Sequence, residues 1–190
     1  MTGLFLKMKM GEIRIFAFGG VTTLNEDLNS SIYKEIIMLI AGPLTQILFY
    51  FFIVFMYKKG YININVFDKI TIINKTLLSF NLLPILPLDG GKLVNNILDL
   101  ILPYQMSHII SIIISFLSLP LLFKLDNKLF VILLTLFLTL KLIEEIKYHN
   151  DRLTKLILER NLKQYKFSKT IILSNIKKVR RNKNYILSSW

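Results

Sequence analysis

The 190-residue sequence has no cysteine and only two histidines, His108 and His149. Without cysteine the chain cannot form disulfides, thiolate metal sites or a cysteine nucleophile. Neither histidine belongs to a His-Glu-x-x-His pattern, which places two metal ligands on one face of a helix. The chain therefore cannot build that kind of metal site by itself. We expect His108 to be an interfacial residue at a helix start and His149 to be solvated.

Charged residues are scarce before Glu145 and frequent after it. The net charge is +12, and half of the 24 Lys and Arg residues follow Glu145. Few aromatic residues are interleaved with them, so the pattern favours attraction to anionic lipid headgroups and argues against a nucleic-acid partner. We expect residues 147–190 to form a basic cytosolic helical tail. Residues 166–190 alone look too short to bury a core.

Apolar residues form long blocks rather than periodic stripes. They make up 53% of the chain, and the mean hydropathy is +0.53. The pattern predicts an all-α polytopic membrane protein with about four transmembrane segments, preceded by a short N-terminal β-hairpin. An even number of spans puts both ends on one side, and the positive-inside rule makes that side cytosolic. The four predicted spans are residues 36–57, 70–88, 109–123 and 129–143.

The residues before the first predicted span do not resemble a signal peptide, because charges interrupt them. The stretch "EIRIFAFGGVTTL", residues 12–24, partly alternates and is split by Gly19 and Gly20, which predicts a β-hairpin with a glycine turn. The chain then divides into a membrane-associated hairpin segment (residues 1–30), a transmembrane core (31–146) and the tail (147–190).

The stretch "FNLLPILPLDGGKL", residues 80–93, breaks the second predicted span. A membrane-depth aspartate costs about 2.5 to 3.5 kcal/mol on insertion scales, so Asp89 must face water, a partner or a metal ion. We expect Gly90 and Gly91 to adopt φ values that other residues avoid. Irregular backbone at this depth is tolerated beside a cavity, where Asn81 can also donate a hydrogen bond. A short amphipathic helix over residues 92–102 should follow.

Simpler interpretations of these residues exist. Asp89 can be the N-cap of the following helix, in a loop at the lipid headgroups. Asn81 can be an interhelical hydrogen-bonding residue, and the "AGP" at residues 41–43 can serve helix packing.

Four segments in order resemble the site-2 protease (M50) family of intramembrane zinc metalloproteases. The stretch "NLLPILPLDGG" is similar to the family's Asn-Leu-Leu-Pro and Pro-Leu-Asp-Gly-Gly motif, and "IAGPLTQ" resembles its Ala-Gly-Pro segment. The stretch "FAFGGVTTL" looks like the hairpin strand of the sporulation factor IVB subgroup, and residues 141–165 are similar to its cytosolic exit.

The resemblance implies a zinc endopeptidase of the bacterial cytoplasmic membrane. In this family one Zn²⁺ is held by two histidines of an HExxH helix and by the motif aspartate, while the glutamate is the general base. Carried over, Asp89 is the third zinc ligand and Asn81 contacts the substrate backbone or oxyanion. The hairpin at Phe18 to Val21 would guide a membrane-tethered substrate, such as a sigma-factor precursor or an anti-sigma factor. Regulatory membrane proteins are further expected partners.

The absent HExxH motif is the main departure from the family. Its expected place is at or just before Met1, so we expect the chain to be a fragment that binds no stable zinc alone and is inactive alone. One alternative is a non-catalytic pseudoprotease that binds membrane substrates. Another is a small transporter or channel subunit with Asp89 as an ion site.

Overall fold

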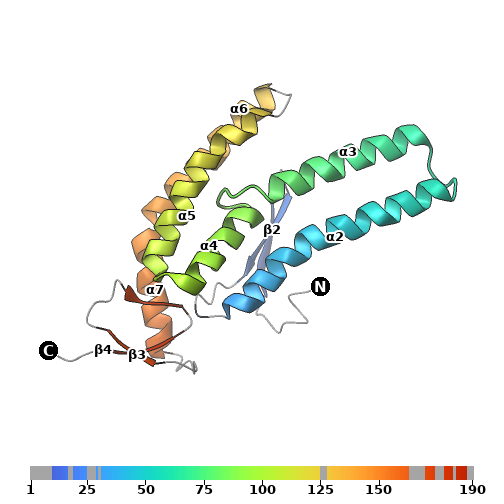
Figure 1. The fold of residues 1–190 in the computed structure, drawn as a ribbon. Coiled ribbons are helices and arrows are strands. Elements are labelled where there is room, and N and C mark those ends of the chain that lie inside the picture. The colour runs from blue at the N-terminus through green and yellow to red at the C-terminus, as the bar shows by residue number, and fades with distance from the viewer. Residues whose placement is uncertain are drawn as a thin grey trace. The chain divides into compact units, whose positions relative to one another are not determined.

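The computed structural model describes residues 10–16, 19–24, 29, 31–124, 128–162, 170–173, 178–181 and 183–187. Helices dominate, accompanied by two short pairs of strands (Figure 1). The chain divides into two compact units, and several helices run from one unit into the other. Unit 1 comprises Met1–Met38, Asn95–Ile110 and Ile143–Trp190, and unit 2 comprises Leu39–Val94 and Ser111–Leu142.

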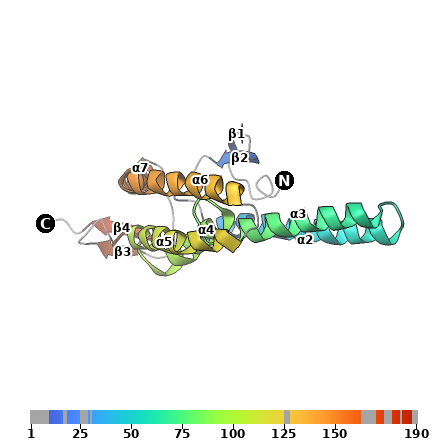
Figure 2. The same ribbon diagram turned by 90° about the horizontal axis from the view of Figure 1, so that it is seen from above.

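The strands β1 (Met10–Phe16) and β2 (Gly19–Leu24) of unit 1 form an antiparallel pair (Figure 2). The register sets Ile15 opposite Gly20 and Phe16 opposite Gly19. Both glycines therefore belong to the second strand, and the expected glycine turn is wrong. Phe18, which the resemblance assigns to substrate guidance, lies outside the described residues.

The helices α2 (Ile32–Lys58) and α3 (Ile64–Asn81) run side by side as a hairpin (Figures 1 and 2). Pro43 lies inside α2 without ending it. Gly60, whose φ is 78°, follows α2 in a left-handed conformation that glycine adopts at low cost. The side chain of Asn63 caps α3 by accepting a hydrogen bond of 2.9 Å from the amide of Val66.

The third and fourth predicted spans correspond to longer stretches of helix. They are α5 (Tyr104–Ser118), its 3₁₀ continuation η1 (Leu119–Lys124), and α6 (Lys128–Lys147). The short helix α4 (Asp89–Ile101) precedes α5. The core of unit 2 lies between these elements and the break in the chain, and its buried residues are Ile85, Leu86, Ile112, Leu122, Val131, Leu138 and Leu142.

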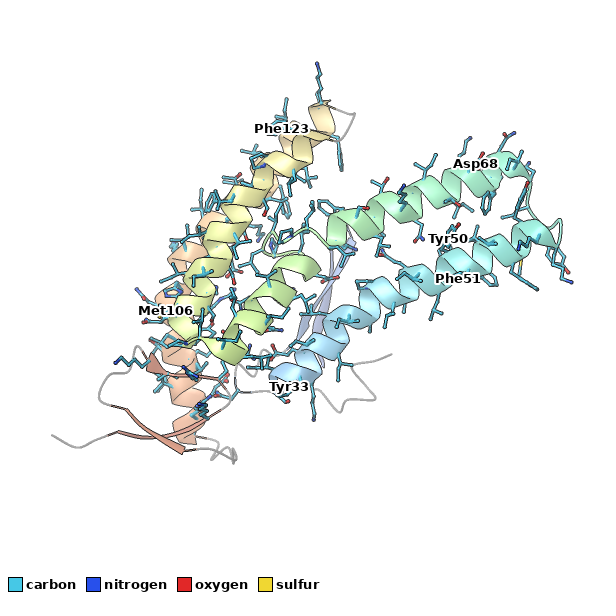
Figure 3. All side chains as sticks on the ribbon, viewed as in Figure 1. Tyr33, Tyr50, Phe51, Asp68, Met106 and Phe123 are labelled. Atoms are coloured by element: carbon cyan, nitrogen blue, oxygen red, sulfur yellow. The ribbon has the colours of Figure 1, made fainter. Side chains whose placement is uncertain are left out.

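Two helical stretches in the described part of the chain are long and apolar enough to cross a membrane, namely Ile32–Lys58 and Tyr104–Phe123. Their side chains project outward along the helices, as the labelled Phe51 and Phe123 show (Figure 3). These two residues are 62% and 67% exposed, which suits a lipid-facing surface. The helices α3 and α6 each contain more charged residues than such a span tolerates. Two of the four predicted spans are thus supported.

The tail contains more than a helix. After α7 (His149–Leu162) come β3 (Thr170–Leu173) and β4 (Asn184–Leu187), which pair in parallel. Val179 is 3% exposed and packs in a cluster with Tyr104, Leu153 and Leu156. A purely helical tail is therefore a wrong prediction, because β3 and β4 follow α7. Val179 packs against α5 and α7, so its burial depends on residues outside the stretch 166–190.

Candidate functional site

The break in the chain is anchored inside unit 2. After α3 the backbone turns through two short hydrogen bonds, from Ile85 N to Leu83 O at 2.7 Å and from Leu88 N to Ile85 O at 2.8 Å. The amide of Leu86 donates to Ser115 Oγ on α5 at 2.9 Å. Ile85 and Leu86 are 0% and 6% exposed. The irregular backbone at Ile85 and Leu86 is thus covered by protein, which is the condition for such backbone to be tolerated within a bilayer.

Gly90 and Gly91 are required by close backbone contacts. A Cβ on Gly90 would lie 2.3 Å from the carbonyl oxygen of Leu82, and one on Gly91 would lie 2.4 Å from the carbonyl carbon of Ile85. Both glycines lie in the first turn of α4, and neither has a positive φ. The expectation of an unusual φ is therefore wrong, and the missing side chains are what lets the loop fold back onto the helix.

Asp89 borders a small, almost wholly apolar pocket of unit 2. A Cβ on Gly42 would lie 3.5 Å from Asp89 Oδ2, so the Ala-Gly-Pro segment of α2 and the motif aspartate are neighbours. The cavity measures about 100 Å³ and Asp89 is half-buried beside it. The pocket is lined by Leu39, Ile40, Pro43, Leu82, Asp89, Gly90 and Leu93.

The helix α4 begins at Asp89 itself. The amide of Lys92 donates to the carbonyl of Leu88 at 3.0 Å, which gives Leu88 the cap position and puts Asp89 in the first turn. A carboxylate there still interacts favourably with the helix dipole. Asp89 is therefore not the N-cap. It lies in the first turn of α4, next to the pocket.

Asn81 is the last residue of α3 and is half-buried. No hydrogen bond of its side chain is found among the described residues. The interhelical role belongs instead to Asn74, whose Nδ2 donates to the carbonyl of Gln46 on α2 at 3.1 Å. The structure thus leaves the amide of Asn81 available for a contact outside the described residues.

The described residues do not fit a zinc site. Structural and catalytic zinc sites use at least three protein ligands. No group of three or more histidine, aspartate, glutamate or cysteine side chains with metal-binding geometry occurs in the described part of the chain. Asp89 contributes one carboxylate among apolar neighbours, so any zinc bound there needs ligands from elsewhere.

The two histidines meet in unit 1. His108 Nδ1 on α5 lies 2.8 Å from His149 Nδ1 on α7, and the rings stack with centroids 5.0 Å apart. His108 Nε2 lies 3.4 Å from Glu145 Oε2 on α6. His108 is only 2% exposed. His108 is therefore buried in protein, contrary to the expectation of an interfacial residue, whereas His149 is half-buried and only partly solvated.

Glu145 and His149 have shifted pKa values outside the predicted spans. Burial alone would raise the pKa of Glu145, but the hydrogen bond with His108 and the charge of Arg152, 2.8 Å away, hold that pKa below its usual range. Burial lowers the pKa of His149, and the neighbouring His108 and Arg152 lower it further. His149 is therefore stabilised in its neutral form.

Sequence reasoning missed a buried ion cluster around Arg181. The Arg181 guanidinium is 4% exposed and binds Glu35 of α2 and Asn96 and Asp99 of α4. In the sequence Arg181 is one of several basic residues of the tail, so nothing in the local pattern distinguishes it from the others.

The described elements define a helical protein with two membrane-compatible stretches and an aspartate at a helix break beside an apolar pocket. No family model matches the chain. The chain is similar to stage IV sporulation protein FB of Bacillus subtilis (strain 168), with 30% identity over 161 residues. The aligned region covers 82% of this chain and 56% of that relative, so the chain spans about half of the relative's length.

Proposed function

We propose that this chain is part of an intramembrane zinc metalloprotease of the site-2 protease type. The observation that carries the proposal is the proximity of Asp89 to Gly42, which brings the two motifs of the resemblance to one pocket. The similarity to a sporulation protein over 82% of the chain agrees with it. Membrane-compatible helices supply the setting in which such an enzyme acts.

In this proposal Asp89 is one ligand of the metal, and the two histidine ligands come from a segment outside the 190 residues. The apolar side chains of Leu39, Ile40 and Leu93 beside Asp89 lower the local polarity and would so strengthen the interaction of the carboxylate with a cation. Asn81, at the end of α3, contacts the backbone of the substrate. Zinc, when bound, would polarise the carbonyl of the substrate and activate a water molecule.

The proposed substrate is a membrane-tethered protein, because the pocket belongs to a unit with lipid-compatible surfaces. The relative's name points to sporulation, which favours a sigma-factor precursor or an anti-sigma factor as the target. The proposed location is the bacterial cytoplasmic membrane with the C-terminus in the cytosol, in agreement with the positive-inside rule.

The test is Asp89→Asn in the full-length protein. We expect bound zinc, measured by mass spectrometry of the purified protein, to fall from about one per chain to near zero. Cleavage of a tethered substrate should fall at least a hundredfold, while membrane insertion stays unchanged. Asp68→Asn is the matched control, because Asp68 is exposed on α3, near the turn that joins it to α2 (Figure 3). Retention of one zinc per chain in Asp89→Asn would refute the role of Asp89.

A second candidate function is a non-catalytic pseudoprotease. This alternative applies if the full-length protein contains no HExxH, as in these 190 residues. Under this alternative the DNA upstream of Met1 encodes no HExxH in any frame, and a membrane partner co-purifies equally well with Asp89→Ala. An upstream HExxH in frame would instead support the protease.

A further inference from the structure

Arg181 is a buried cation that joins the C-terminal segment to two helices of unit 1. Its Nη1 donates to Asn96 Oδ1 at 3.2 Å and to Asp99 Oδ2 at 3.1 Å, and its Nη2 donates to Glu35 Oε1. The residue is 4% exposed. A planar guanidinium can serve several acceptors at once, whereas an ammonium is a single point charge.

Asp99, one of the two carboxylates that bind Arg181, lies in a buried site with a second hydrogen-bond donor. Asp99 is 1% exposed, and Ser107 on α5 donates a hydrogen bond to its other oxygen. Burial raises the pKa of Asp99, and the guanidinium of Arg181 and the hydroxyl of Ser107 oppose that rise. Burial alone would lower the pKa of Arg181, but Glu35 and Asp99 hold it above its ordinary range. Removing the guanidinium would leave a carboxylate buried without its counter-charge, which is strongly unfavourable.

Further contacts join the backbone around Arg181 to the rest of unit 1. The guanidinium of Arg160 on α7 donates to the carbonyls of Arg180 at 3.0 Å, of Lys183 at 2.5 Å and of Arg181. On the other side, the amide of Tyr104 donates to the carbonyl of Val179 at 2.9 Å. Backbone hydrogen bonds thus add to the Arg181 side chain in holding Val179, Arg180, Arg181 and Lys183 on unit 1.

We propose that Arg181 is a positioning residue that docks the C-terminal segment onto α4 and thereby fixes the helix whose first residue is Asp89. Asn96 and Asp99 are three residues apart, so they share a face of α4, and one guanidinium holds both. A single helix transmits a rotation or shift along its length. The catalytic half of this proposal rests on the proposed function, but the docking does not.

The experiment compares Arg181→Ala and Arg181→Lys with Lys178→Ala in the full-length protein. Lys178 is exposed in the same segment, so its removal takes away an equal charge without touching the buried cluster. Docking is measured by hydrogen exchange of residues 178–187. Function is measured as kcat and KM for a tethered substrate and as zinc content.

We expect Arg181→Ala to exchange at least tenfold faster in residues 178–187 and to lose at least tenfold in kcat. KM should change less than twofold, and Lys178→Ala should match the unmodified protein. Arg181→Lys should fall between the two, because a compact ammonium keeps the charge but cannot reproduce the spread of donors on the planar guanidinium. If Arg181→Ala does not accumulate, Arg181→Ala with Asp99→Asn removes the uncompensated carboxylate and should restore yield with the segment still undocked.

Unchanged exchange in Arg181→Ala would overturn the docking. Faster exchange with an unchanged kcat would overturn the positioning role. Faster exchange in a protein that shows no proteolysis in any variant would support the docking while refuting the proposed function.

Discussion

His108 and His149 lie in contact although 41 positions separate them in the chain. One of the two facing nitrogens must donate and the other accept, so the pair requires at least one unprotonated nitrogen. Glu145 contacts the opposite side of the His108 ring, and Arg152 contacts Glu145. The four side chains join α5, α6 and α7 by polar contacts, and these contacts depend on the protonation of the two histidines and of Glu145.

The depressed pKa of His149 predicts a loss of stability in mild acid. A histidine whose folded-state pKa lies below its unfolded value near 6.5 stabilises the fold above that value and loses this contribution as the pH falls. We expect the unfolding temperature of the protein in detergent to decrease between about pH 6.5 and pH 5. His149→Gln should flatten this part of the profile, and a profile unchanged by that substitution would contradict the prediction.

Asp89 and the Ala-Gly-Pro segment with Gly42 could be singled out from the sequence because each belongs to a contiguous motif with its own local chemistry, but their proximity was not predicted. The partnership of the histidines and the burial of Arg181 could not be predicted, because both depend on contacts between residues far apart in the chain. A lone histidine or arginine gives the same local signal whether it is solvated or buried.

The helix α4 and the loop before it form one tightly fitted element. The loop passes so close to the first turn of α4 that no side chain fits at Gly90 or Gly91. Ser115 on α5 fixes the same loop by accepting the amide hydrogen of Leu86. Asp89 thus sits where an irregular loop, a helix start and α2 meet within unit 2.

Gly90→Ala should therefore destabilise the protein. A Cβ at 2.3 Å from a backbone oxygen forces the loop to shift, and we expect a loss of about 1 to 3 kcal/mol from overpacking. Gly42→Ala is the control, because its Cβ would meet Asp89 Oδ2 at an ordinary 3.5 Å. Thermal unfolding in detergent measures the stability of both variants. Equal unfolding temperatures would contradict the close contact between the loop and Gly90.

The helical elements were largely predictable because uncharged runs determine them. The span predicted over residues 36–57 corresponds to α2, and the helix predicted over 92–102 begins three residues earlier, at Asp89. The second predicted span was placed too late, since α3 covers Ile64–Asn81 and the irregular loop follows it. The strands β3 and β4 were missed because a basic sequence with short apolar stretches gives no clear alternation.

Membrane insertion is best supported for two of the four predicted spans. In the described residues only α2 and the stretch Tyr104–Phe123 combine length with few charges. The charged residues of α3 and α6 can be accommodated in a bilayer where they face protein or reach the headgroups. The proposed arrangement, with both ends in the cytosol, follows from the number of spans and the basic tail.

The absence of cysteine makes this arrangement directly testable. Single substitutions Lys59→Cys, after α2, and Lys155→Cys, on α7, introduce unique thiols at exposed positions. We expect an impermeant maleimide to label Lys59→Cys in intact cells and Lys155→Cys only after permeabilisation. The reverse pattern would show that the orientation is inverted.

The helix α3 has no fully buried residue, and among the described residues one side-chain hydrogen bond, from Asn74, joins it to α2. Few buried contacts make local opening inexpensive in free energy. Separation of α3 from α2 would uncover the carbonyl of Gln46 and the partnerless buried oxygens Gln46 Oε1 and Thr71 Oγ1. An extended polypeptide could donate hydrogen bonds to those groups once the two helices separate, and in the proposed protease that polypeptide would be the substrate.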